Sequence, residues 1–366
     1  MKDKIGIGFI GTGFARRTQI PGFAAAEDAR LVSVSSGSAA NAESTAGEFG
    51  FQHFSGDWRD TVSHADVDLV CITTPPSMHH EMASFALENG KHVLCEKPMA
   101  MNAGEASDML ELAEQKGLMA IIDHELRFLE GRMHAFKSIR EGEIGKIRHI
   151  KYIWGNGMRG DKSVPWTWWS DEASGGGALG AIGSHIVDTI RWFSESEIVR
   201  VFCRLATHVK EREFEGAQRE VTTDDETLMI MELSDSEFVK NATALVSASL
   251  AESGPYRNEV EIYGTEGAYK ILDRGELFKV SSGSQEWERV EINETPLAKG
   301  MMDSGWSRGF TVIAEKICSA LKNGETKVDF AATFADGLKI QKVLDAARES
   351  NSTGRLVETG CTFAAY

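Results

Sequence analysis

A lysine placed directly after an apolar strand pattern is the first residue in this sequence that could do chemistry. The segment 92–95 has the pattern of a short β-strand, and it is followed by Glu96, Lys97 and Pro98. Open α/β sheets bind ligands in the crevice outside the carboxyl ends of their parallel strands. A lysine there can direct its ammonium toward a bound cofactor and the substrate oxygen beside it, although most lysines that follow strands are simply solvated.

A second candidate for proton chemistry lies in the glycine-rich segment 173–188, which contains Gly-Gly-Gly at 175–177 and then Gly-Ser-His-Ile-Val-Asp at 183–188. His185 and Asp188 are three residues apart, so they share one face of the helix expected there. A histidine suits proton transfer in an alcohol–carbonyl interconversion. The alternative is a buried histidine satisfied by local hydrogen bonds, but the glycines and three preceding tryptophans, including Trp169, favour a functional role.

A glycine turn near the N-terminus predicts dinucleotide binding. Gly11 and Gly13 follow an apolar strand pattern, and Phe14, Ala15 and Arg16 begin a helical pattern. Glycines here permit a tight turn and let backbone N–H groups approach a pyrophosphate. The fingerprint is incomplete because Arg16 stands where a third small residue is usual, but its place at the start of a βαβ unit supports cofactor binding over a plain turn.

The residues after the second strand bear on the choice between NAD and NADP. NAD-binding sheets usually carry an Asp or Glu here for the ribose 2′-hydroxyl, and the window 34–38 has no acid. Ser36 and Ser38 are compatible with a 2′-phosphate, and Arg16 could supply a cation. We therefore expect NADP rather than NAD, although a serine and glycine turn that accepts either cofactor is the alternative.

The fourth strand pattern is ended by prolines, which force an extended exit over the sheet edge. Thr74 and Pro75 in this exit are expected to lie against the nicotinamide ribose. His79 either contacts the cofactor or begins the next helix.

The elements that must position these residues change in kind along the chain. Residues 1–125 alternate strands with helices, which predicts a Rossmann-type α/β domain with a mostly parallel sheet. From 126 to 366 long strand patterns follow one another with short turns, which predicts an α+β domain with a large, mostly antiparallel open sheet. A chain of 366 residues exceeds the size of a single core, in agreement with two domains.

Composition narrows the class of protein. The net charge of −16 argues against binding nucleic acid or an anionic membrane face. Five scattered cysteines form neither a disulfide framework nor a metal site, so we expect no metal and a reducing compartment. With no signal-type stretch and no apolar run long enough for a membrane span, a cytoplasmic protein is expected.

Taken together, the glycine turn at 11–13, Glu96-Lys97-Pro98 and the segment 175–188 resemble the glucose–fructose oxidoreductase/inositol dehydrogenase/MocA family over essentially the whole chain. The resemblance implies that Lys97 hydrogen-bonds the reacting oxygen and the nicotinamide ribose, that Glu96 touches the cofactor, and that His185 completes the acid/base set. It also implies a cis peptide before Pro98, and a second-half sheet that serves as substrate floor and as the interface of a homodimer or homotetramer.

Two departures from the family pattern matter. The position four residues before the histidine, often Asp, is Ala181, which leaves Lys97 and His185 to share the proton chemistry. Members that use NADP with a serine at position 36 tend to have a basic residue a few positions later, and the nearest residue here is Asn41.

The resulting hypothesis is an NAD(P)-dependent dehydrogenase or reductase acting on a sugar, cyclitol or related polyhydroxylated alcohol or carbonyl. Arg127, Trp169 and Asp188 are further candidates for the substrate pocket, and Arg127 is equally suited to a structural role. The alternatives are a non-catalytic, cofactor-binding regulatory protein and an enzyme for a non-sugar such as a dihydrodiol.

Overall fold

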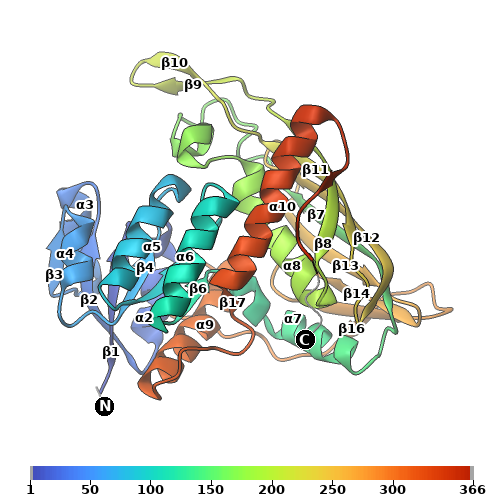
Figure 1. Cartoon of the computed structure of the whole chain (residues 1–366), viewed down its shortest axis with the longest axis horizontal. Coiled ribbons are helices and arrows are strands. Elements are labelled where there is room, and N and C mark those ends of the chain that lie inside the picture. The colour runs from blue at the N-terminus through green and yellow to red at the C-terminus, as the bar shows by residue number, and fades with distance from the viewer. Residues whose placement is uncertain (1–2, 363–366) are drawn as a thin grey trace. The chain divides into compact units, whose positions relative to one another are not determined.

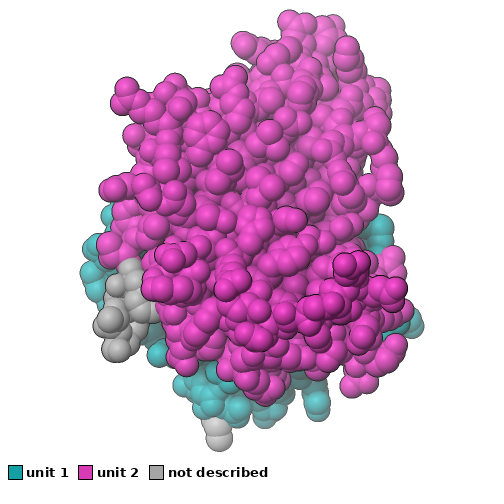
Figure 2. All heavy atoms as spheres, turned by 90° about the vertical axis from the view of Figure 1, so that its right-hand side faces the viewer, with its two compact units in different colours: residues 1–129, 294–338 teal, residues 130–293, 339–366 magenta. Residues whose placement is uncertain are grey.

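The computed structural model describes residues 3–362 and divides the chain into two compact units. Unit 1 contains residues 1–129 and 294–338, and unit 2 contains residues 130–293 and 339–366 (Figure 2). The sequence-based division at 125/126 placed segment 294–338 in the second domain, whereas the structure packs it in unit 1. Among residues 3–362, no helix is both long and apolar enough to cross a bilayer.

Unit 1 is built on a seven-stranded sheet in the order β17-β6-β5-β4-β1-β2-β3 (Figure 1). Its strands are β1 (Ile5–Ile10), β2 (Ala29–Ser35), β3 (His53–Ser55), β4 (Leu69–Ile72), β5 (His92–Cys95), β6 (Ala120–Ile122) and β17 (Ala332–Thr333). All pairs are parallel except β17 with β6. This doubly wound order confirms the predicted Rossmann fold and places a switch point between β1 and β4.

The helices of unit 1 connect its strands, and some of them are capped by polar side chains or glycines. They are α1 (Phe14–Arg17), α2 (Gln19–Ala25), α3 (Ala39–Phe49), α4 (Trp58–Ser63), α5 (His79–Glu88), α6 (Ala103–Lys116), α9 (Gly305–Lys322) and the 3-10 helices η1 (Pro76–Met78) and η2 (Glu125–Phe128). Asn102 caps the start of α6, and Gly117 ends it in the left-handed region. The helical pattern that begins at Phe14 forms two helices, α1 and α2, because Thr18 leaves helical geometry at φ −132° and ψ −60°.

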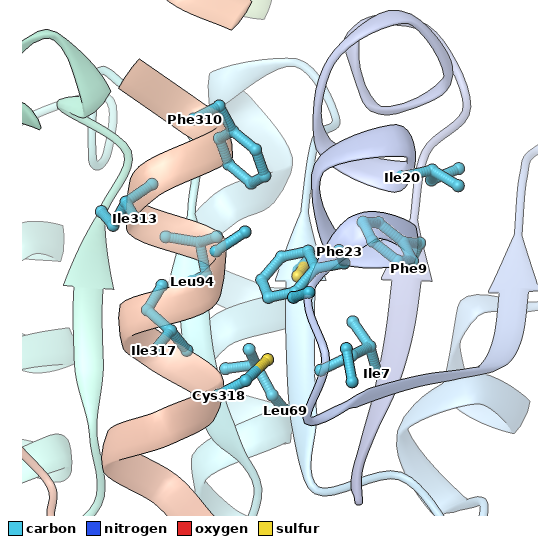
Figure 3. Packing of buried hydrophobic residues seen from close by; sticks show 14 of the residues in the cluster. Ile7, Phe9, Ile20, Phe23, Leu69, Leu94, Phe310, Ile313, Ile317 and Cys318 are labelled. Carbon is cyan, nitrogen blue, oxygen red and sulfur yellow. The ribbon is translucent and has the colours of Figure 1, made fainter. Parts of the chain in front are cut away.

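Helix α9 completes one face of the unit 1 core. Its residues Phe310, Ile313, Ile317 and Cys318 pack with side chains of α2 and of strands β1, β4 and β5 (Figure 3). The rings of Phe23 and Phe310 meet edge to face at 5.6 Å between centroids. The segment 294–338 is therefore an integral part of unit 1, although it follows unit 2 in the chain.

Unit 2 contains a nine-stranded sheet in the order β16-β15-β14-β13-β7-β12-β11-β8-β18. The strands are β7 (Ile147–Gly155), β8 (Ile198–Ala206), β11 (Glu226–Leu233), β12 (Val239–Ser249), β13 (Arg257–Tyr263), β14 (Gly267–Ile271), β15 (Leu277–Ser281), β16 (Glu288–Val290) and β18 (Val357–Glu358). Only β7 and β12 run parallel, so the predicted large, mostly antiparallel sheet is confirmed.

Helices cover one face of this sheet. Helix α7 (Glu130–Arg140) contacts β14 and β15, and α8 (Ser184–Ser194) contacts β7 and β12. Helix α10 (Phe334–Thr353) begins in the last residues of unit 1 and continues into unit 2. The strands alternate buried and exposed residues, as β11 does, which is typical of a sheet with one open face.

A separate hairpin, β9 (Glu211–Phe214) with β10 (Ala217–Glu220), was not foreseen from the sequence. It is fixed by the buried Arg212, whose guanidinium donates to the backbone carbonyls of Arg159, Asp161 and Val164. The indole N–H of Trp166 donates to the carbonyl of Glu220 at 2.9 Å. Both contacts join the hairpin to the loop that carries the tryptophans.

Candidate active site

The glycine turn at the end of β1 has the geometry that a dinucleotide site needs. Gly11 has φ +97°, and a Cβ there would lie 2.6 Å from Oγ1 and 2.8 Å from the carbonyl oxygen of Thr73. A side chain is therefore excluded at Gly11 by conformation and by space. By contrast, a Cβ at Gly13 would meet nothing within 4 Å, which leaves room for a ligand to approach the backbone. These residues fit a bound pyrophosphate at the carboxyl end of the sheet.

Arg16 has an acidic partner within unit 1. Phe14, Ala15 and Arg16 form the single turn of α1, in which Ala15 is buried. The guanidinium of Arg16 forms an ion pair with Glu48 of α3, and both side chains are more than 40% exposed. Exposed pairs contribute little to stability, so Arg16 can leave Glu48 at small cost if an anion is bound nearby.

Ser36 and Ser38 follow β2, but each hydroxyl already has an internal partner. Thr12 donates through its hydroxyl to Oγ of Ser36 at 3.4 Å, and the backbone N–H of Asn41 donates to Oγ of Ser38 at 3.4 Å. Ser38 is the N-cap of α3, a role that explains its hydroxyl without any ligand.

His79 is a structural bridge at the strand ends. Its ring is fully buried, with Nε2 2.9 Å from the carbonyl oxygen of Thr74 and Nδ1 3.0 Å from that of Pro98. Burial lowers the pKa of His79. The ring thus holds the Thr74-Pro75 exit of β4 against the segment after β5. His79 is also the first residue of α5, so of the two alternatives left open by the sequence these contacts favour the structural one.

Lys97 lies at the carboxyl end of β5, where the sequence placed it. The peptide bond between Lys97 and Pro98 is cis, as the family resemblance implied. The backbone N–H of Lys97 donates to the Glu96 side chain at 3.3 Å. Glu96 is only 7% exposed, and its Oε1 accepts a hydrogen bond from the Gln19 amide at 2.9 Å.

Arg127 has structural contacts within unit 1. It is 5% exposed, and its guanidinium donates to the carbonyl of Phe330 at 3.2 Å and lies 3.8 Å from Asp336. These contacts tie η2 to Phe330, just before α10, and to the first turn of α10. Of the two roles considered for Arg127, they support the structural one.

In unit 2, His185 and Asp188 lie on α8 and are both 2% exposed. The helix is preceded by a π-helical turn, Leu179–Gly183, which contains Ala181 and was not predicted. π-Helical turns occur frequently at functional sites. Trp169 lies upstream in η3 (Trp168–Ser170), and its ring is tilted against that of Trp168 at 5.3 Å.

The segment Thr222–Asp225 holds these parts of unit 2 together and was missed by sequence reasoning. The hydroxyl of Thr223 donates to the carbonyl of Trp169 at 2.9 Å, and Asp224 accepts from the backbone N–H of Leu179 at 2.7 Å. Burial raises the pKa of Asp224 to about 6. Four consecutive hydrogen-bonding residues before a strand were the available signal.

Comparisons with known proteins agree with this geometry. Residues 5–124 match the model of the oxidoreductase family with an NAD-binding Rossmann fold, and residues 133–270 match the Gfo/Idh/MocA C-terminal domain. The chain belongs to the Gfo/Idh/MocA family of oxidoreductases. Its doubly wound unit 1 and open-sheet unit 2 are the two domains of that family.

Relatives match over most of the chain. Levoglucosan dehydrogenase of Pseudarthrobacter phenanthrenivorans is 27% identical over 339 residues, which cover 84% of each protein. Human glucose-fructose oxidoreductase domain-containing protein 2 is 26% identical, covering 97% of this chain and 93% of the relative. Among solved structures, an oxidoreductase domain protein from Kribbella flavida has a TM-score of 0.88 at 28% identity over 98% of this chain and 100% of that one. Levoglucosan dehydrogenase in complex with NADH and L-sorbose also has a TM-score of 0.88, at 26% identity over 97% and 99% of the two chains.

Proposed function

We propose that this Gfo/Idh/MocA oxidoreductase uses NAD(P) to interconvert an alcohol and a carbonyl on a sugar, a cyclitol or a related polyhydroxylated compound. The observation that carries the proposal is Lys97 at the carboxyl end of β5, in the sheet whose β1 ends in the Gly11 turn. A relative of similar structure binds NADH and L-sorbose, which supports the substrate class.

Each unit has its own part in this proposal. Unit 1 binds the dinucleotide at Gly11, Gly13 and the strand ends, and unit 2 supplies His185 and the floor of the substrate site. The nicotinamide, when bound, exchanges a hydride with the substrate carbon. Lys97 and His185 stabilise the developing alkoxide and move its proton, and they share this work because Ala181 has no ionisable group.

The test is an assay of NAD(P)H absorbance across a panel of sugars and polyols. We expect turnover with at least one compound, and Lys97→Ala to lower it by about 100-fold or more while cofactor still binds. Lys116→Ala is the control, because Lys116 is an exposed lysine at the end of α6. Turnover of Lys97→Ala equal to that of Lys116→Ala would remove Lys97 from the mechanism.

The choice of cofactor depends on the ribose end of the site. Ser36, Ser38 and Arg16 favour NADP. Arg16 is the only charged residue of the three, and its ion pair with Glu48 competes with binding of a 2′-phosphate. NADP binding therefore requires Arg16 to exchange Glu48 for the 2′-phosphate, and NAD binding does not.

We further propose that the open face of the unit 2 sheet joins two copies of this chain. Ile230 of β11 pairs with Phe202 on β8 and with Leu245 on β12, so three apolar side chains lie in one row. They are 50%, 37% and 47% exposed, respectively. A contiguous apolar patch of this kind is typical of an interface.

The buried free thiols of Cys71, Cys95, Cys203, Cys318 and Cys361 support a reducing compartment such as the cytoplasm.

A further inference from the structure

Three carboxyl groups are buried in the interior of unit 1, and one of them, Glu96, directly precedes Lys97 in the chain. Glu96 follows β5, Asp123 follows β6, and Glu125 begins η2, and they are 7%, 0% and 1% exposed. Burying an ionised carboxylate is costly unless a cation or several hydrogen bonds compensate for it. Three such groups in one place therefore need an explanation.

A single amide group bridges two of them. Gln19, buried at the start of α2, donates from Nε2 to Oε1 of Glu96 at 2.9 Å and to Oδ2 of Asp123 at 2.6 Å. Because one amide nitrogen contacts an oxygen of each group, the carboxyl groups of Glu96 and Asp123 lie close together. Two ionised carboxylates at this separation in a buried site repel each other, so we expect one of them to be protonated.

The surroundings indicate which partner holds the proton. Burial raises the pKa of both groups, and that of Asp123 further, because Glu125 and Glu96 add like charge to it. Lys97 lowers the pKa of Glu96 by its positive charge. The other titratable neighbours are the thiols of Cys71 and Cys95, whose pKa values burial raises, so they contribute no charge.

We propose that Glu96 and Asp123 share one proton, held on the Asp123 side, so that the pair presents a single negative charge to Lys97. Both are positioning residues that act through Lys97. The pair orients the start of the Glu-Lys-Pro segment through the Lys97 N–H bond and places one negative charge beside the lysine ammonium. This inference rests on the proposed function only where it concerns Lys97.

The shared proton can be detected without any activity. In infrared spectra at about pH 8, a protonated carboxyl group gives a carbonyl band distinct from that of carboxylates, and Asp224 is ionised at that pH. With aspartate labelled by carbon-13, we expect this band to shift in the folded wild-type protein and to be absent in Asp123→Asn. A folded wild-type protein without a protonated-aspartate band would overturn the proposal. The infrared measurement on the wild-type protein remains a valid test even if the variant does not fold.

The effect on Lys97 is tested by the pH profile of kcat/KM for alcohol oxidation, with Glu96→Gln and Asp123→Asn compared. Glu96→Gln removes the one negative charge, so the acid limb should move to lower pH by about one unit or more. Asp123→Asn replaces a neutral group by a neutral group, so the limb should stay within a few tenths of a unit of the wild type. Equal shifts in the two variants would mean that both carboxyls are ionised, which contradicts the pair. An infrared band with no turnover on any substrate would leave the pair intact and reject the proposed function.

Discussion

The carboxylate of Asp224 accepts a hydrogen bond from the backbone N–H of Leu179, with 2.7 Å between Oδ2 and the nitrogen. This bond fixes the turn that leads into the helix of His185. A Cβ on Gly177 would lie 2.4 Å from Oδ1 of the same carboxylate, so the glycine is needed for the close approach. Asp224 also accepts from the hydroxyl of Thr227 at 2.9 Å. The glycine segment 175–180 is thus shaped by a residue that lies more than 40 positions later in the chain.

This buried carboxyl predicts a pH-dependent stability. The pKa of Asp224 rises from 3.8 to about 6 on folding, so the folded chain binds the proton more tightly than the unfolded chain. Its contribution to the free energy of unfolding therefore falls as pH rises through that interval, by about 3 kcal/mol in total. Asp224→Asn should lose this dependence between about pH 4 and pH 6, as measured by urea unfolding. The control Asp329→Asn removes an exposed carboxyl and should keep it; an unchanged slope in Asp224→Asn would contradict the assignment.

A second prediction concerns the docking of α9 in unit 1. A Cβ on Gly309 would lie 2.2 Å from the carbonyl oxygen of Glu125, so Gly309→Ala should destabilise the protein by about 1–3 kcal/mol. Gly47 in α3 is the matched control, because a Cβ there meets nothing within 4 Å. Gly47→Ala should instead stabilise by about 0.5–1 kcal/mol through helix propensity. Equal thermal shifts in the two variants would reject the contact.

These two contacts show where sequence reasoning reaches its limit. The strands of unit 1 were predictable because buried parallel strands appear as short apolar runs, as in β4 and β5. The place of α9 in unit 1 depends on Gly22 and Gly309, whose close contacts lie far away in sequence. Local periodicity carries no information about such partners.

The candidate site likewise has some features that the sequence predicts and others that it does not. The turn at Gly11 follows from a short motif, the cis peptide before Pro98 was implied by the family resemblance, and the structure contains both features. The bridge made by His79 and the Glu96–Asp123 contact join residues 19 and 27 positions apart, so they appear only once the strands are ordered. The hairpin β9–β10 was missed because β10 is exposed throughout and has no apolar alternation.

The cofactor preference can be changed at Glu48. Replacing this residue by Gln removes the charge that pairs with Arg16 and frees the guanidinium for a 2′-phosphate. We expect Glu48→Gln to raise the ratio of kcat/KM for NADP over NAD by about 5- to 10-fold. Glu43→Gln, on an exposed position of the same helix, should leave the ratio unchanged. If the ratio does not respond to Glu48, Arg16 does not contact the ribose end.

The sheet face of unit 2 gives a prediction about assembly. Ile230→Asp places a charge in the middle of the apolar row and should convert the assembled protein to monomers, as measured by light scattering after size exclusion. Met302→Asp is the control, because Met302 is 76% exposed and lies in unit 1. An assembly that tolerates Ile230→Asp would place the interface elsewhere.

We propose that Lys97 and His185 both act on the oxygen of the reacting substrate group. A crystal structure of the protein with NAD(P)H and a sugar that it turns over tests this most directly. We predict that Nζ of Lys97 and a ring nitrogen of His185 both lie within about 3.2 Å of the reacting oxygen. A complex in which either side chain is too far away to reach that oxygen, directly or through one water, would contradict the account.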